Sequence, residues 1–117
     1  MSQIYDYAGS LHRMGDDQAL FTEMVGLLRS DVPQWLNVLH AAEREGDASR
    51  VQRAAHTLKG LAANFGASRA VAAAAEVEQC GKAQTTEGLH EAVAELEGSL
   101  DELLGALTAP VATSATR

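Results

Sequence analysis

The sequence is poor in aromatic residues and in basic residues. Aromatic side chains make up 4% of the 117 residues, so the core must be built mainly from aliphatic residues and alanine. This composition favours closely packed helices over a sheet. Lys and Arg number 9 against 16 Asp and Glu, and the formal net charge of -7 provides no basic stripe to neutralise phosphates. We therefore exclude nucleic acid as a partner.

Cysteine and long apolar segments are also scarce. Cys80 is the single cysteine, so no intrachain disulfide can form and nothing points to an oxidising compartment. No apolar run approaches the length that crosses a bilayer, and the first ten residues, MSQIYDYAGS, lack the regions of a secretion signal. We expect a cytoplasmic chain that makes no contact with a membrane.

The residues that are present predict one all-α domain, since 46% of the residues are hydrophobic and 117 residues can share a single core. Apolar residues at helical spacing predict one short and five longer helical segments, at about 6–13, 17–30, 31–45, 47–65, 68–80 and 86–107. Alternatively, the second and third segments form one helix with a kink at Pro33. Short loops predict an up-and-down antiparallel four-helix bundle with a short additional N-terminal helix over residues 1–108, followed by a flexible tail at 109–117.

The ends of these segments are predicted from capping residues and glycines. We expect the segments to begin at the N-caps Asp17, Asp31, Asp47, Ser68 and Thr85 or Thr86. We expect three of them to end at Gly46, Gly66 and Gly81. The stripe predicted for the segment at 17–30 consists of Leu20, Phe21, Met24, Leu27 and Leu28.

The segment Ala54–Ala67, AAHTLKGLAANFGA, combines an apolar stripe with a polar patch. The stripe consists of Val51, Ala54, Ala55, Leu58, Leu61, Ala62 and Phe65. At 100° per residue its centre lies about 160° from His56, so we expect an exposed imidazole. Lys59, Gly60 and Ala63 fall within about 60° of His56 on the same helix face.

Glycine is unusual on such a face because it costs about 1 kcal/mol relative to alanine inside a helix. Two explanations for Gly60 stay open: a partner approaches the helix there, or a neighbouring helix crosses there. An exposed imidazole, a nearby cation and cleared space are what a phosphoryl relay needs. The three other histidines have no such neighbours and are interpreted as core residues or solvent-exposed ones: His12, His40 and His90.

The segment HTLKGLAANFGA resembles the signature of histidine-containing phosphotransfer (HPt) domains. The matching positions are His56, Leu58, Lys59, Gly60 and Gly66. The resemblance covers about Ile4 to Leu107, and Leu61 departs from it because the family often has Ser or Ala after the first glycine. In this family a polar side chain about 22 residues after the histidine often lies beside the imidazole, and here that position is Glu78, next to Gln79.

The resemblance implies a phosphocarrier. A receiver domain of a response regulator or of a hybrid sensor histidine kinase passes its phosphoryl group to His56, and a second receiver takes it onward. The resemblance gives Lys59 the role of a cation near the phosphoryl group and Glu78 that of an acceptor for the Nδ1 proton. Mg²⁺ is expected on the receiver, with no cofactor or metal in this chain. We expect a monomer that contacts partners through Gln52, Lys59, Gly60, Ala63 and Asn64.

Other interpretations remain. The chain can be a helical adaptor that docks on receivers or other partners without carrying phosphate, with His56 as a contact residue. Glu78 can be a solvated carboxylate at the edge of its helix. An autonomous enzyme is disfavoured because the sequence contains no ATP-binding motif, no HExxH and no nucleophile paired with a base.

Overall fold

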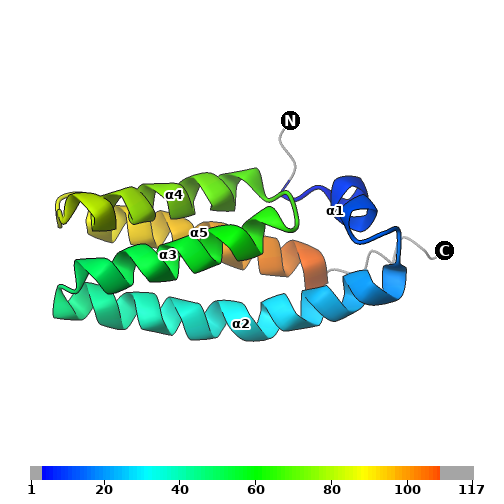
Figure 1. The fold of residues 1–117 in the computed structure, drawn as a ribbon, viewed down its shortest axis with the longest axis horizontal. Coiled ribbons are helices and arrows are strands. Elements are labelled where there is room, and N and C mark those ends of the chain that lie inside the picture. The colour runs from blue at the N-terminus through cyan, green and yellow to red at the C-terminus, as the bar shows by residue number, and fades with distance from the viewer. Residues whose placement is uncertain (1–3, 109–117) are drawn as a thin grey trace.

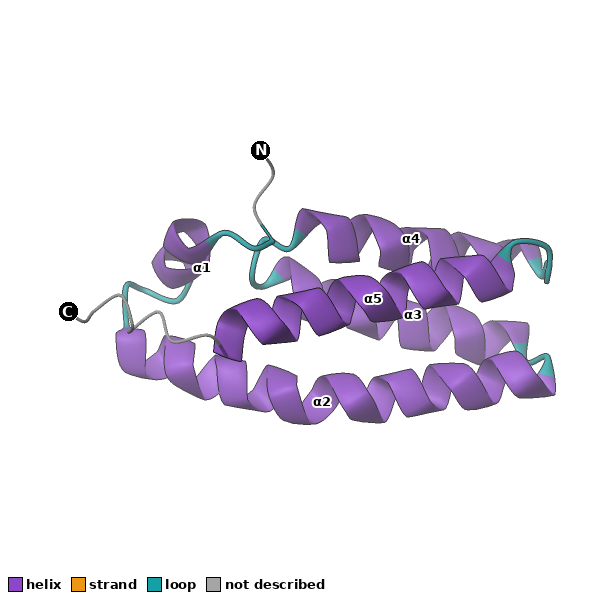
Figure 2. Cartoon of the chain, turned by 180° about the vertical axis from the view of Figure 1, so that it is seen from behind, coloured by secondary structure: helices purple, strands orange, loops and turns teal. Residues whose placement is uncertain are grey.

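The protein is described here from a computed structural model, which describes residues 4–108. Five helices follow one another in this part of the chain: α1 (Tyr7–Arg13), α2 (Gln18–Glu45), α3 (Ala48–Ala63), α4 (Ser68–Ala83) and α5 (Leu89–Thr108). The four longer helices form an antiparallel bundle, and α1 lies at one end of it (Figures 1 and 2). The predicted all-α four-helix bundle with a short N-terminal helix is confirmed. The predicted tail at 109–117 lies outside the described residues.

Aspartates and glycines set several of the helix ends. Asp6, Asp17 and Asp47 are N-caps, and each carboxylate accepts the backbone N–H of the residue three positions further on. Gly46 ends α2 with a φ of 68°, and Gly66 follows α3 with a φ of 62°. Only glycine adopts this left-handed conformation without a steric cost, so the ends of α2 and α3 could be predicted from the sequence.

The predicted helix start at Asp31 is wrong, because α2 runs unbroken from Gln18 to Glu45 with Pro33 inside it. Residues 4–108 therefore contain four long helices, as in the alternative that joined the second and third predicted segments into one helix. A proline inside a helix costs about 3 kcal/mol through its missing N–H and its ring. The buried stripe continues on both sides of it, with Val32 0% and Leu36 7% exposed. Burial along a continuous stripe offsets the cost of the proline.

The ends of α4 and the start of α5 also differ from the prediction. Ser68 is the first residue of α4, and the N-cap position is taken by Ala67, which makes no side-chain cap. The last helix begins at Leu89, after the predicted cap at Thr85 or Thr86. The Thr85 hydroxyl instead accepts the backbone N–H of Glu87 at 3.1 Å, inside the loop that precedes the helix.

Gly81 was expected to end a helix but lies inside α4, which continues to Ala83. A Cβ atom at Gly81 would lie 2.8 Å from the backbone N and 2.9 Å from the Cα of Gln52 on α3. Gly81 therefore allows α3 and α4 to approach each other closely. At Gly60 a Cβ atom would meet nothing within 4 Å. The helix crossing that was considered for Gly60 occurs at Gly81.

The core lies between the four long helices and is built from aliphatic side chains, alanines and Phe65. The stripe predicted for α3 is buried except at Leu61, which is half-buried. On α2 the predicted stripe is too wide, because Leu20 is 37% and Leu27 is 52% exposed. The first turns of α2, which carry Leu20, extend beyond the ends of α3 and α5 (Figure 1). No helix within residues 4–108 has both the length and the apolar character needed to cross a membrane.

The two glycines on α3 and α4 give a matched test of this packing. We expect Gly81→Ala to lower the free energy of unfolding by about 1–3 kcal/mol, because the new methyl group is forced against the backbone of Gln52. Gly60→Ala should raise it by up to about 1 kcal/mol, since alanine is the better helix former and the space is open. Urea denaturation of both variants measures the difference. Equal effects of the two substitutions would contradict a close helix approach at Gly81.

Candidate functional site

His56 lies on the outer face of α3, and its side chain is 69% exposed. Its Nδ1 atom is 3.0 Å from Oε2 of Glu78 on α4. The two residues are brought together by the packing of α3 against α4, because Glu78 stands three positions before Gly81 on the same helix. The exposure of His56 agrees with the apolar stripe of α3, which faces the opposite way.

Glu78 is only 7% exposed, and both of its carboxylate oxygens are hydrogen-bonded. Lys59 Nζ donates to Oε1 at 2.6 Å, while Oε2 faces the imidazole of His56. The hydrogen bond from Lys59 holds the pKa of the Glu78 carboxyl below its ordinary value, with a further lowering from His56 and an opposing effect of burial. Glu78 is therefore an ionised, buried carboxylate. The alternative of a solvated side chain at the helix edge is wrong.

The contact with Glu78 determines which nitrogen of His56 can react. An ionised carboxylate can only accept hydrogen bonds, so the neutral imidazole carries its proton on Nδ1. The lone pair then resides on Nε2, on an exposed side chain. Such a nitrogen can attack an electrophile that arrives from solvent or on a partner protein.

Lys59 places a positive charge beside the imidazole. Its side chain is 32% exposed and its ammonium group is held by Glu78, so the cation is fixed at the site. Gly60 lies next to it, and because a Cβ atom there would meet nothing within 4 Å, no neighbouring helix explains this glycine. The structure brings His56, Lys59 and Glu78 into one hydrogen-bonded group, and the bond from Lys59 to Glu78 was not predicted from the sequence.

The remaining predicted contact residues lie along the same helix. Ala63 and Asn64 are exposed at the end of α3, and their carbonyl groups accept hydrogen bonds from Arg13 of α1. Gln52 is half-buried, four residues before His56, where α4 crosses at Gly81.

A hollow beside His56 includes residues that the sequence did not indicate. It is lined by Trp35, Gln52, Arg53, His56, Thr57, Glu78 and Lys82, and we call it the His56 hollow. Trp35 comes from α2, Arg53 from α3 and Lys82 from α4. Trp35 stands at the edge of the α2 stripe, directly before Leu36, where a pattern cannot tell a core residue from a surface one. Only the packing of three helices shows that these side chains share a surface with His56.

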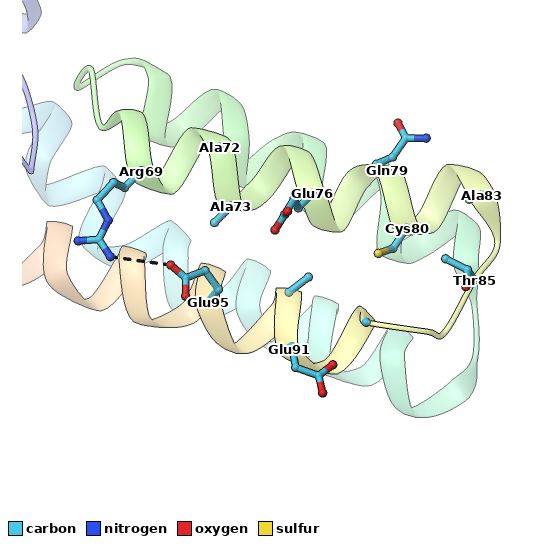
Figure 3. A pocket seen from close by; sticks show the side chains of 12 residues that line it. Arg69, Ala72, Ala73, Glu76, Gln79, Cys80, Ala83, Thr85, Glu91 and Glu95 are labelled. Atoms are coloured by element: carbon cyan, nitrogen blue, oxygen red, sulfur yellow. Dashed lines mark ion pairs between the residues drawn. The ribbon is translucent and has the colours of Figure 1, made fainter.

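A larger hollow, the α4–α5 groove, lies elsewhere on the molecule (Figure 3). Its walls are mostly small residues, and Arg69 and Glu95 form an ion pair of 3.8 Å across it. His56, Lys59 and Glu78 do not line it. The larger hollow is therefore not the one that His56 and Glu78 line.

The other histidines are engaged with single carboxylates. His40 Nε2 lies 3.1 Å from Glu97, and His90 Nδ1 lies 3.1 Å from Glu43. His12 is 83% exposed and lies 3.8 Å from Asp16. None of these pairs includes a lysine, so the combination of imidazole, carboxylate and ammonium is found at His56 among the histidines that the structure describes.

Comparisons with known proteins identify a family and a similar fold. A family model described as "Hpt domain" matches residues 23–106. The fold is similar to the crystal structure of histidine-containing phosphotransfer protein B (HptB) from Pseudomonas aeruginosa PAO1. The TM-score is 0.83, with 19% sequence identity, and the match covers 91% of this chain and 92% of that one. No curated protein sequence matches the chain.

The lowered pKa of Glu78 predicts how stability depends on pH. The charge of Glu78 contributes fully above the ordinary glutamate value of 4.5, and its contribution is lost as the pH falls through the lower pKa of the folded state. We expect Glu78→Gln to be less stable than the natural protein at pH 7, with a difference that shrinks below pH 4.5. Urea denaturation between pH 7 and pH 3 measures it.

Glu76→Gln is the matched control, because Glu76 is an exposed carboxylate on the same helix. It should change stability little at either pH. A destabilisation by Glu78→Gln that stays constant from pH 7 to pH 3 would assign the effect to packing and not to the charge.

Proposed function

Since the chain belongs to the Hpt domain family, we propose that it is a phosphocarrier that holds a phosphoryl group on Nε2 of His56 within a phosphorelay. The family match supports a role in histidine phosphotransfer. The choice of His56 is supported by one observation above all: an exposed imidazole whose Nδ1 faces a buried, ionised carboxylate. Nε2 is thereby left as the free nucleophile.

The proposed transfer begins when a receiver domain brings an aspartyl phosphate to His56. Nε2 donates its lone pair to phosphorus, the bond between phosphorus and the aspartate oxygen breaks, and the aspartate leaves as a carboxylate. The imidazole keeps its Nδ1 proton and becomes positively charged, with Glu78 as its counter-ion. In the onward step an aspartate of a second receiver attacks phosphorus, and the electron pair of the phosphorus–nitrogen bond returns to Nε2.

Lys59 serves this reaction through its fixed charge. It lies one helical turn after His56 and is anchored on Glu78 at 2.6 Å. In this position it keeps Glu78 ionised and adds positive potential near the oxygens of the incoming phosphoryl group. Mg²⁺ belongs to the receiver in this proposal, and the chain is an intermediate in transfer without kinase activity of its own.

The partners that fit this role are receiver domains of response regulators and of hybrid sensor histidine kinases. We place the exchange in the cytoplasm and between a monomer of this chain and one receiver at a time. Docking includes the face of α3 that carries Gly60, Ala63 and Asn64, where the side chains are small or exposed. An adaptor that docks without accepting phosphate is the competing function.

The proposal is tested by incubating the chain with a phosphorylated receiver domain. We expect the natural protein to gain a phosphate that is labile in acid and stable in alkali, as a phosphorus–nitrogen bond requires. His56→Gln should fold normally and gain none, since an exposed side chain contributes little to the core.

His90→Gln is the control, because His90 is also exposed and also faces a glutamate. It should be labelled like the natural protein. Labelling that persists in His56→Gln would move the phosphorylated residue to another histidine. Binding of the receiver with no labelling of the natural protein would favour the adaptor.

Gly60 provides a second test of docking at this face. Gly60→Leu should leave the protein at least as stable, because leucine forms helices better by up to about 1 kcal/mol and no neighbour lies within 4 Å of the new Cβ. It should nevertheless slow phosphotransfer by obstructing the receiver. Gly98→Leu on α5, where the space is also open, serves as the control and should transfer at the normal rate. Unchanged transfer in Gly60→Leu would rule out a receiver that closes over Gly60.

A further inference from the structure

We propose that the receiver also covers the His56 hollow and that Trp35, Arg53 and Lys82 are the residues by which this chain recognises its receiver. The inference rests on the proposed function. It adds to that function the side of His56 on which the receiver docks. The face predicted from the sequence runs along α3 towards Asn64. The His56 hollow instead extends the contact across to α2 and to the last turns of α4.

The hollow offers an apolar side chain beside the reactive imidazole. Trp35 is half-buried, packs against the core on one side and lines the hollow together with His56. A tryptophan that is held by the core loses little conformational freedom on binding and presents a large apolar area. Tryptophan and arginine are the side chains that most often dominate the energy of protein interfaces. The partner segment that fits here carries an apolar side chain.

The cations of the hollow are available to a partner. Arg53 and Lys82 are exposed, and neither has a hydrogen-bond or ion-pair partner among the residues that the structure describes. Arg50, Lys59 and Arg69, by comparison, are all paired with carboxylates. In a chain with a formal net charge of -7, two unpaired cations therefore flank the reactive histidine.

A receiver domain has the complementary charge. In the proposed transfer it brings an aspartyl phosphate together with the carboxylates that would hold Mg²⁺, and these anions outnumber the two charges of the ion. When these anions face His56, the carboxylates come close to Arg53 and Lys82. Opposite charges on the two surfaces speed the encounter and orient it, and this effect weakens as salt screens it.

The α4–α5 groove does not compete as the docking surface. Arg69, its basic residue, is already paired with Glu95 and Glu102, and the groove shares no lining residue with the His56 hollow. A partner seated in that groove would leave His56 uncovered. The docking surface that includes the reactive nitrogen is the His56 hollow.

The single tryptophan allows docking to be observed directly. Trp35 is the only tryptophan of the chain, so its fluorescence reports on the hollow when the titrant is a tryptophan-free receiver domain that accepts phosphate from this chain. We expect the emission of Trp35 to change as the receiver binds. Trp35→Ala should raise the Kd about tenfold or more, and Trp35→Phe should restore part of the affinity.

Leu27→Ala is the matched control, because Leu27 is an exposed apolar residue on the same helix and does not line the hollow. It should leave the Kd unchanged. Circular dichroism of each variant verifies the fold. Should Trp35→Ala fail to fold, Trp35→Phe and the exposed charge variants still test the proposal.

The charge variants separate recognition from chemistry. Arg53→Glu and Lys82→Glu should raise the KM for the receiver several-fold at low salt and less at high salt, with little change in the transfer rate at saturation. Arg44→Glu makes the same change of charge on an exposed arginine outside the hollow and should have a much smaller effect.

Two results lead to different conclusions. If phosphate passes between the chain and the receiver while Trp35→Ala, Arg53→Glu and Lys82→Glu all keep the natural Kd and KM, the docking inference is wrong and the proposed function stands. If no receiver exchanges phosphate with the natural protein, the proposed function fails, and the docking inference fails with it.

Discussion

The close approach of α3 and α4 is the packing constraint on which the site depends. At Gly81 the backbone of α4 comes so near to Gln52 that a single methyl group would collide with it. Three residues earlier on the same helix, Glu78 is thereby brought to 3.0 Å from Nδ1 of His56. A wider separation of the two helices would move this carboxylate out of hydrogen-bonding distance. The tautomer of the histidine is thus set by how tightly two helices pack.

The buried carboxylate in turn requires the charges around it. An ionised group that is 7% exposed is costly unless its oxygens are hydrogen-bonded, and Lys59 and His56 supply those bonds. Both partners come from the same face of α3, one turn apart, so one helix satisfies both oxygens. The group leaves Nε2 as the unprotonated nitrogen of an exposed imidazole. The same contacts that stabilise the carboxylate therefore orient the imidazole.

Much of this arrangement could be predicted from local patterns. The apolar stripe of α3 predicts that His56 faces outwards, and Asp17 and Asp47 mark helix starts that the structure contains. These features depend on residues close in sequence. The continuous helix through Pro33 could not be settled locally, because the burial of Val32 and Leu36 against other helices offsets the cost of the proline. Gly81 was wrongly predicted to end a helix, because a glycine at a helix end and a glycine at a helix crossing give the same local signal.

The exposed position of His56 in the middle of a single helix face also limits the order of events. A specific interface covers about 800 Å² on each partner, far more than the area around one imidazole. In the proposed phosphorelay two receivers could not occupy this face together, and the donor would have to depart before the acceptor arrives. The proposed exchange would therefore follow a ping-pong scheme in which donor and acceptor compete for one docking surface. Throughput then depends on how quickly each partner leaves, so very tight docking would slow the relay.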